Sequence, residues 1–278
     1  MSFGVLGAVL AAALLHASWN ALVKIGPSKQ SAMLIFGICQ ALCGLGIALW
    51  RGFPVAAAWP WLLGSGLIHT SYQLFLGYAY EHGDLSRVYP IARGTAPMVV
   101  LVFSALCLAD PIAGTEVAGI LLLGLGILLM ARGVFTGGEQ RKMLPFALGS
   151  ALSTAGYSVT DGLGGRAAGD PVLYVGWLMM VAAVFYVPVA VGLKGTVLFR
   201  APPCAWGIGM IAGACSVGAY AIAVWAMTVA PIALVAALRE TSILFAMLIG
   251  WLAFGEPMDR GKMAAAGLIV GGVMLTRL

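Results

Sequence analysis

Long apolar runs, separated by short charged or Pro- and Gly-rich segments, follow one another along the whole chain. A helix that crosses a bilayer needs about 20 apolar residues, and the runs have this length, which differs from the alternating segments of about ten residues typical of outer-membrane barrels. The pattern therefore predicts an all-α polytopic membrane protein. Its ten transmembrane helices are expected near residues 3–23, 31–50, 60–80, 88–108, 115–132, 144–164, 171–192, 204–227, 231–254 and 262–277.

The composition excludes a water-soluble globule. Of the 278 residues, 62% are hydrophobic and 9% are charged, and the mean hydropathy is +1.01, whereas a soluble domain has about 25% charged residues. Ten spans would use roughly 200 residues and leave no room for a soluble domain. The formal charge is +5, but the basic residues are scattered at the ends of the runs. We therefore expect membrane lipids, and not nucleic acid, as their partners.

An internal repeat emerges when the chain is compared with itself. At an offset of 146 residues, the Ala-Asp-Pro of residues 109–111 falls on the Gly-Glu-Pro of residues 255–257, and Arg93 falls on Arg239. The fourth and fifth spans therefore repeat as the ninth and tenth.

The first span repeats as the sixth, because Trp19 falls on Tyr157 at an offset of 138 residues. The chain is thus predicted to contain two five-helix repeats, residues 1–136 and 137–278. Five is an odd number, so the second repeat would enter the membrane from the opposite side. Such inverted repeats favour alternating access to one central cavity. An ordinary structural duplication is the alternative interpretation.

Several of these segments resemble a known family. The His-Ala-Ser-Trp-Asn of residues 16–20, the Gly-Asp-Leu-Ser-Arg-Val-Tyr-Pro of residues 83–90 and the paired turns at 109–111 and 255–257 look like the EamA branch of the drug/metabolite transporter superfamily. The likeness extends over nearly the whole chain and includes bacterial amino-acid exporters. It implies an exporter of small metabolites in the bacterial inner membrane, with a small-molecule substrate and no cofactor.

The distribution of basic residues bears on the orientation in the membrane. Connections after odd-numbered spans hold Lys24, Lys29, Arg87, Arg132, Arg141, Lys142, Lys194, Arg200, Arg260 and Lys262, and those after even-numbered spans hold Arg51, Arg166 and Arg277. Because cytoplasmic connections are enriched in Lys and Arg, this count favours termini that face away from the cytoplasm. The family resemblance would place both termini inside, so the orientation is left open.

Two arginines lie inside predicted spans, where a charge costs about 2.5–3.5 kcal/mol and therefore usually faces a cavity or a partner. Arg93 lies in the fourth span and Arg239 at the matching position of the ninth. A guanidinium is suited to a carboxylate or phosphate, so we expect both to bind an acidic substrate. The alternative is that each bonds backbone carbonyls or Glu240. Glu240 itself is a candidate proton carrier, or else forms a helix-to-helix hydrogen bond.

Polar stripes mark the first and third spans. In each, a histidine is followed by an aromatic residue three positions later and by an amide four positions later, which places all three near one helix face. We expect the stripes to line a wet cavity, and both histidines are further proton candidates. Interhelical hydrogen bonding is the alternative, and the spacing fits no metal site. The residues are His16, Trp19 and Asn20, and His69, Tyr72 and Gln73.

Aromatic residues in or near the repeated spans are the last candidates for the site. They are Tyr78 and Tyr89 in the first half, and Tyr157, Tyr220 and Trp225 in the second. Tyr and Trp also gather at membrane interfaces, which is the alternative reading. Together with the arginines, an aromatic wall predicts an amphipathic carboxylate, such as an aromatic or large neutral amino acid, as substrate.

Other functions fit the sequence less well. The chain has no acidic cluster, GxSxG turn or HExxH motif, so an intramembrane enzyme is not expected, and a passive channel would need a continuous pore of like groups. No nucleotide-binding loop is present, so transport would be secondary. The glycine pairs 209/213 and 267/271 allow close helix packing, within a monomer or between the subunits of a homodimer.

Overall fold

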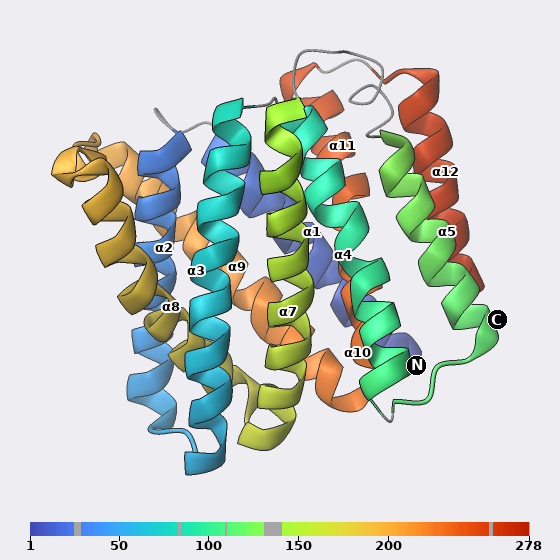
Figure 1. The fold of residues 1–278 in the computed structure, drawn as a ribbon, viewed down its shortest axis with the longest axis horizontal. Helices are drawn as coiled ribbons and strands as arrows, with labels where there is room; N and C mark the ends of the chain where they lie inside the picture. The colour runs from blue at the N-terminus through green and yellow to red at the C-terminus, as the bar shows by residue number, and fades with distance from the viewer. Residues whose placement is uncertain (25–28, 83–84, 109, 131–140, 256–257, 278) are drawn as a thin grey trace.

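The computed structural model describes residues 1–24, 29–82, 85–108, 110–130, 141–255 and 258–277. In these ranges the chain forms α-helices and short 3-10 turns without any strand, which confirms the all-α prediction (Figure 1). The helices are α1 (Phe3–Lys24), α2 (Lys29–Arg51), α3 (Trp59–His82), α4 (Leu85–Cys107), α5 (Gly114–Met130), α7 (Leu144–Ala168), α8 (Pro171–Lys194), α9 (Pro203–Val229), α10 (Ile232–Arg239), α11 (Ser242–Phe254) and α12 (Arg260–Leu275). The 3-10 turns are η1 (Ala56–Ala58), η2 (Arg141–Met143) and η3 (Thr196–Phe199).

The helix ends follow the polar punctuation of the sequence. Between α7 and α8, Gly169 takes a left-handed conformation with φ of 72°, which ends α7 in the usual way. The next residue, Asp170, accepts hydrogen bonds on its side chain from the backbone N–H groups of Val172 and Leu173 at 3.0 and 3.1 Å. With Pro171 in the first turn, where its missing N–H costs nothing, these residues fix the start of α8.

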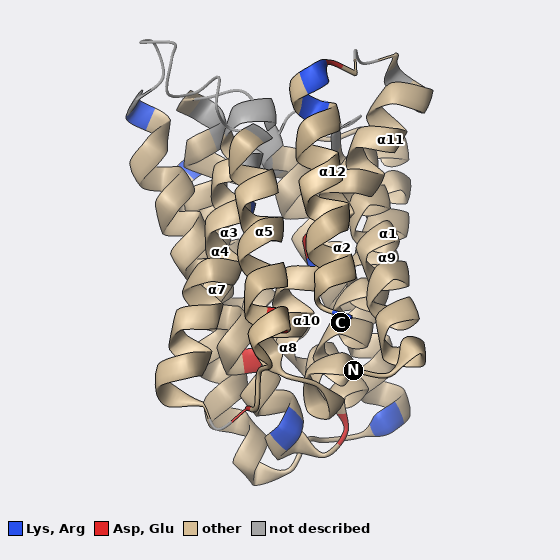
Figure 2. Cartoon of the chain, turned by 90° about the vertical axis from the view of Figure 1, so that its right-hand side faces the viewer, with Lys and Arg blue, Asp and Glu red and all other residues tan. Residues whose placement is uncertain are grey.

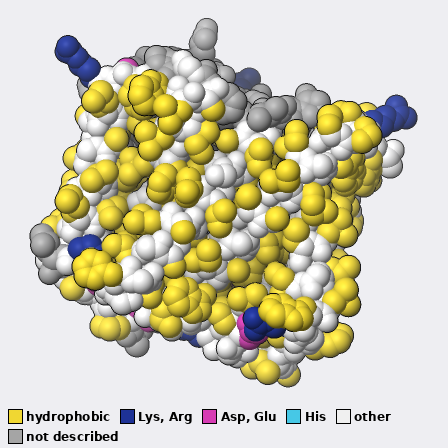
Figure 3. All heavy atoms as spheres, turned by 180° about the vertical axis from the view of Figure 1, so that it is seen from behind, with side chains coloured by type: hydrophobic (Ala, Val, Ile, Leu, Met, Phe, Trp, Pro, Cys, Tyr) yellow, Lys and Arg dark blue, Asp and Glu magenta, His cyan; other side chains and the backbone are white. Residues whose placement is uncertain are grey.

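The outer surface suits a lipid environment. Among the described residues, five helical segments are long and apolar enough to cross a membrane: Phe3–Val23, Ser31–Arg51, Pro171–Lys194, Pro203–Val229 and Ile232–Ala253. Hydrophobic side chains cover most of the face seen in Figure 3, and most Lys and Arg lie at the two ends of the bundle (Figure 2). This arrangement matches a multi-pass membrane protein, whose charged groups stay near water while apolar side chains meet the lipid.

The ninth apolar run differs from the predicted single helix because its hydrogen bonding changes at Glu240 and Thr241. There the N–H groups of Glu240 and Thr241 bond the carbonyls three residues earlier, at 3.0 and 3.1 Å, and the run divides into α10 and α11. The Thr241 hydroxyl also donates to the Leu238 carbonyl at 2.7 Å. The break thus places Arg239 at the C-terminal end of a short helix inside the bundle.

Helices from the two halves of the sequence pack against each other. Helix α1 lies against α9, α3 against α7, α2 against α8, and α5 against α12; the last pair stands side by side at one edge in Figure 1. Both termini lie at the same end of the bundle, where the Arg277 guanidinium donates to the Met1 carbonyl. The core therefore forms between the halves and not within each half alone.

Glycines allow the closest of these contacts. In α9, a Cβ on Gly213 would lie 3.1 Å from the backbone of Cys39 in α2, as expected for the Gly209/Gly213 pair. In α12, the close contact is made by Gly272, where a Cβ would lie 2.7 Å from the Gly119 carbonyl of α5. Gly267 has nothing within 4 Å, so this glycine makes no close helix contact with the described part of its own chain.

Two sequence predictions involve residues outside the described ranges. The repeat boundary at 136/137 falls between α5 and α7, and the paired turns include residues 109, 256 and 257.

Candidate functional site

Two groups of polar side chains lie inside the bundle. We call the first the arginine cluster; it joins α1, α4 and the break between α10 and α11, and consists of His16, Arg93, Arg239 and Glu240. We call the second the aspartate cluster; it joins α3, α7, α8 and α9, and consists of His69, Asp161, Tyr174 and Tyr220.

In the arginine cluster, Arg93 is 2% exposed and holds two partners. Its Nε lies 3.0 Å from Glu240 Oε2, and its Nη2 lies 2.8 Å from His16 Nε2. Arginine stays charged in proteins, so the carboxylate of Glu240 has a permanent cationic partner. Glu240 therefore ties the broken helix to α4.

His16 faces a donor on each ring nitrogen. Trp19 Nε1 approaches its Nδ1 at 3.2 Å, on the opposite side from Arg93. A neutral imidazole accepts a hydrogen bond at only one nitrogen, so His16 accepts from Arg93 or from Trp19, but not from both at once. Trp19 is further held by stacking on Phe36, at 4.4 Å between ring centroids, and Asn20 donates to the His16 carbonyl at 2.8 Å.

Arg239 is 6% exposed and points to a different neighbour. Its guanidinium carbon lies 5.1 Å from the centroid of the Tyr220 ring, which gives a cation–π contact. In the described part of the chain it has no ion pair, and its Nη1 is buried without a hydrogen-bond partner. The adjacent acid, Glu240, is already engaged by Arg93. Arg239 is thus a buried cation that lacks an ion pair among the described residues.

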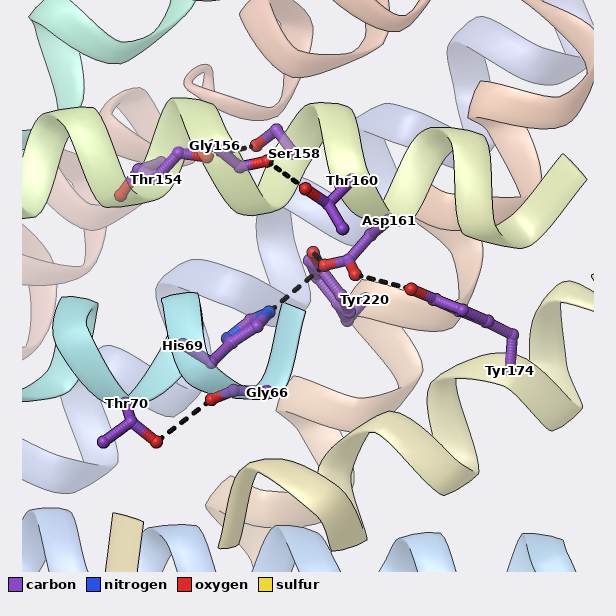
Figure 4. A network of polar contacts seen from close by, with 10 residues as sticks. All are labelled: Gly66, His69, Thr70, Thr154, Gly156, Ser158, Thr160, Asp161, Tyr174 and Tyr220. Carbon is purple, nitrogen blue, oxygen red and sulfur yellow. Dashed lines mark hydrogen bonds and ion pairs between the residues drawn. The ribbon is translucent and has the colours of Figure 1, made fainter. Parts of the chain in front are cut away.

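The aspartate cluster is centred on Asp161, which is 0% exposed. The Tyr174 hydroxyl donates to its Oδ1 at 2.9 Å, the Tyr220 hydroxyl donates to its Oδ2, and His69 Nε2 lies 3.2 Å from the same Oδ2. Figure 4 shows the three partners converging on this carboxyl group from three different helices. Both oxygens of this buried acid therefore have hydrogen-bond partners, as buried polar groups usually do.

An aromatic wall connects the two clusters. The His69 ring stacks on Tyr157 at 4.2 Å between ring centroids. Tyr157 also makes edge-to-face contacts with Tyr72 and Tyr220, at 5.5 and 6.1 Å between ring centroids. Tyr220 takes part in both clusters, because its ring faces Arg239 while its hydroxyl bonds Asp161. Tyr220 therefore links Arg239 to Asp161.

A third ion pair lies at the end of the bundle, outside the spans. Arg166 forms a bidentate pair with Asp110, at 2.7 and 2.9 Å, and Asp110 also accepts from the Ile232 N–H at 3.1 Å. Partial burial raises the pKa of Asp110, but the hydrogen bonds from Arg166 and Ile232 outweigh it and hold that pKa below its ordinary value. The pair ties the connection between α4 and α5 to α7 and to the start of α10.

Comparison with known proteins identifies the family. The model of the EamA-like transporter family matches the chain twice, over residues 2–132 and 141–278. The chain belongs to the EamA-like transporter family. It is therefore a member of the drug/metabolite transporter superfamily and a membrane transporter of small molecules, as the sequence motifs had implied.

Structural comparison of this EamA-like protein supports its fold. A solved structure described only as the crystal structure of a protein matches with a TM-score of 0.78 at 20% sequence identity, over 99% of this chain and 98% of that chain. At this identity the likeness shows the fold alone. No curated protein sequence matches the chain.

Most of the residues expected at the site meet in the EamA-like bundle. Those found in or beside the two clusters are His16, Trp19, Asn20, His69, Tyr72, Arg93, Tyr157, Tyr220, Arg239 and Glu240. Gln73 is buried one turn beyond His69, and its Oε1 has no hydrogen-bond partner among the described residues.

Two expected residues are not brought to these clusters. Tyr78 instead stacks on Phe146, at 5.7 Å, near the end of the bundle where α7 begins. Trp225 is 38% exposed on the surface of α9, so we leave it out of the site. Tyr89 belongs to α4, but its side chain is outside the described part of the structure.

Sequence reasoning missed Asp161 and Tyr174. The signal was present, because an acidic residue inside an apolar run is costly and usually functional. The predicted span ended at residue 164, close enough for an aspartate to reach water, whereas α7 continues to Ala168 and Asp161 is fully buried. Tyr174 had no distinguishing signal, since its role comes from the bond to Asp161.

Proposed function

We propose that this EamA-like protein is a secondary transporter that works by alternating access and carries amino acids with aromatic or large neutral side chains. The observation that carries the substrate class is Arg239, a buried guanidinium without an ion pair in the described part of the chain. Transport in the export direction across the bacterial inner membrane follows what the family resemblance implies.

The alternating-access mechanism is supported by how the helices pair. If α7 to α12 repeat α1 to α5, each contact between the halves should occur twice, with the roles of the halves exchanged. The contact of α1 with α9 then corresponds to that of α7 with α3, and both occur. The contact of α4 with α7 likewise corresponds to those of α10 and α11 with α1, which also occur. The family model also matches once in each half. These pairings favour inverted repeats, 1–136 and 137–278, that rock around a site between them.

The substrate carboxylate is assigned to Arg239. A guanidinium presents a planar fork that pairs with a carboxylate through two parallel hydrogen bonds, and the break after Arg239 is the kind of discontinuous helix found at transporter sites. Arg93 is a weaker candidate, because Glu240 and His16 already occupy it.

The substrate side chain is assigned to the aromatic wall next to Arg239. Tyr220, Tyr157 and Tyr72 offer ring faces and edges within one contiguous group. Aromatic pairs contribute about 0.5–1.5 kcal/mol beyond simple burial, so a ring-bearing or large apolar side chain would bind better than a small or charged one. Together the two contacts favour an amphipathic carboxylate.

Counterflow in proteoliposomes tests this assignment. Vesicles that contain the purified protein and an excess of unlabelled amino acid are diluted into labelled tryptophan, phenylalanine, methionine, glutamate or lysine. We expect rapid counterflow of the aromatic and large apolar members. Arg239→Met should reduce it by about 10- to 100-fold, because a hydrogen bond to a charged group contributes about 1.5–3 kcal/mol.

The matched control is Arg51→Met, which removes a guanidinium paired with Asp170 at the end of the bundle and should leave counterflow unchanged. If no amino acid in the panel exchanges, the amino-acid assignment is wrong. Equal losses in the Arg239 and Arg51 variants would refute a specific role for Arg239.

A further inference from the structure

We propose that Asp161 and His69 form a proton-binding site through which a proton gradient drives transport by this protein. The proposal rests on the proposed transport function and adds its source of energy. It assigns a role to Asp161, which lies 0% exposed in the middle of the aspartate cluster, and it changes the set of proton carriers expected from the sequence.

The surroundings of Asp161 identify which group can change its charge. Tyr174 from α8 and Tyr220 from α9 donate their hydroxyls to the carboxyl group, and a tyrosine normally keeps its proton at neutral pH. His69 from α3 is the remaining contact, 3.2 Å away. Imidazole and carboxyl groups both bind protons reversibly, so the Asp161–His69 pair is the part of the cluster that can carry one.

The cations and aromatic rings around the Asp161–His69 pair do not prevent it from binding and releasing a proton. Tyr157, on the same helix as Asp161, stacks on His69, and Arg239 from α10 lies beyond the Tyr220 ring and not on the carboxyl group. No Lys or Arg forms an ion pair with Asp161 in the described part of the chain. The charge of Asp161 is therefore balanced at contact distance only when His69 is protonated, or is removed when the carboxyl group itself is protonated.

Glu240 and His16 are less suited to carry the proton. Glu240 lies 3.0 Å from Arg93, whose guanidinium does not lose its proton, so its carboxylate already has a cationic partner in contact. His16 faces the same Arg93, and protonating it would place two cations in contact. The Asp161–His69 pair has neither obstacle.

The step itself moves one proton. With His69 neutral and Asp161 ionised, the pair carries one negative charge; uptake of H⁺ from water at one side forms one N–H or O–H bond and makes the pair neutral. Release to water at the other side breaks that bond. The two sites titrate as a unit, so either may hold the proton, and no other bond changes.

A row of polar groups leads from the pair toward one end of the bundle. Gln73, one turn beyond His69 on α3, and Ser150 and Thr154 on α7 each have a buried side-chain oxygen without a hydrogen-bond partner among the described residues. Helices α3 and α7 run antiparallel, since Phe75 packs on Gly149 and Ile68 on Gly156. Gln73 therefore lies level with residues 150–154, toward the end where α7 begins.

These oxygens are suited to hold ordered water, because buried water usually bridges polar groups that lack protein partners. The row is therefore a route by which a proton could reach the pair. Tyr220 supplies the connection to the substrate, since its hydroxyl bonds Asp161 and its ring faces Arg239. A proton on the pair and a carboxylate on Arg239 would act on the same side chain.

The test compares exchange with driven accumulation in the same proteoliposomes. With one proton moved per substrate, a pH difference of one unit drives up to about tenfold accumulation of a labelled amino acid that counterflows. Asp161→Asn should lose this accumulation while keeping counterflow within about fivefold of the wild type, because counterflow needs no net proton movement. Glu116→Gln, which alters a carboxylate at the start of α5, is the control and should keep both.

A second measurement needs no substrate. Acid–base titration of the purified protein between pH 5 and 9 should show about one proton fewer bound per chain in the double variant Asp161→Asn/His69→Gln than in the wild type, because both members of the pair are removed, and no difference in Glu116→Gln. If Asp161→Asn does not fold, Tyr174→Phe serves instead. It removes one hydrogen bond to the carboxylate, so the pH midpoint of driven accumulation should move upward while the maximal counterflow rate stays the same.

The outcomes separate this proposal from the transport function. Absence of counterflow in the wild type would refute the amino-acid assignment, and the titration would still decide the proton site. Counterflow with pH-driven accumulation that survives Asp161→Asn would refute the proton site alone. Accumulation that follows a Na⁺ gradient and ignores the pH gradient, an equal titration of wild type and variant, or an unchanged midpoint in Tyr174→Phe would also overturn it.

Discussion

The contact between Arg93 and Glu240 is expected to be a structural ion pair whose two members depend on each other. Both side chains are almost fully buried, at 2% and 3% exposed, and lie 3.0 Å apart. Replacing only Arg93 by methionine leaves a buried carboxylate without its cation, and replacing only Glu240 leaves a buried guanidinium that retains His16. Replacing both removes the two charges together and fills the space with apolar side chains.

The expected loss follows from this geometry. At 3.0 Å and an effective dielectric constant of about 20, the attraction is about 5–6 kcal/mol, and breaking a buried pair by removing one partner costs about 3–5 kcal/mol. A protein of this size loses about 2–4 °C of melting temperature per kcal/mol. We therefore expect each single variant to melt about 6–20 °C lower, and the double variant to recover most of that difference.

Thermal unfolding in detergent, followed by the fluorescence of the purified protein, measures the four members of this cycle. The same cycle on Arg51 and Asp170, which are 39% and 31% exposed, is the control and should show coupling below about 1 kcal/mol. If the losses at Arg93 and Glu240 simply add in the double variant, the two residues are not a mutually dependent pair, and Glu240 returns as a candidate proton carrier.

Two further predictions concern packing and pH. Gly272→Ala should lower the free energy of unfolding by about 1–3 kcal/mol, since its Cβ would lie 2.7 Å from the Gly119 carbonyl; Gly267→Ala on the same helix, with open space around it, should be neutral or slightly stabilising, and equal melting temperatures would contradict this. At the Asp110–Arg166 pair, the lowered pKa of Asp110 means that its stabilisation is complete above the ordinary aspartate pKa of about 4 and is lost as the pH falls through the folded-state value. Asp110→Asn should therefore melt lower than the wild type at pH 7, by roughly 1 kcal/mol of stability, and converge with it in acid; a difference that persists in melting curves at low pH would be inconsistent with this explanation.

Local sequence signals were sufficient to predict where the helices lie along the chain. The apolar runs place the helices, because every backbone polar group must be satisfied inside a bilayer and a helix does this within one segment. The Gly169-Asp170-Pro171 sequence fixes a helix end and the next start through conformation and capping that involve neighbouring residues only. The arginines and the histidine stripes could also be found, because polar groups in such runs are conspicuous.

The depth and partners of each polar side chain required the tertiary structure. Glu240 is adjacent in sequence to Arg239 but pairs with Arg93 on another helix, and the helix break that permits this lies inside a segment that the sequence predicts to be one span. Asp161 stood near a predicted span end, and only the packing of α3, α8 and α9 around it showed that it is buried.

The amino-acid sequence is enough to show that the chain is helical, apolar and repeated, because these properties depend on composition and on spacing along one chain. It could not determine which face of each helix turns inward. Lipid tails are as apolar as a protein core, so hydrophobicity does not separate Tyr220, which reaches Asp161, from Trp225, which lies on the surface of the same helix. That distinction arises only when helices from both halves pack together and bring side chains from distant parts of the sequence into contact.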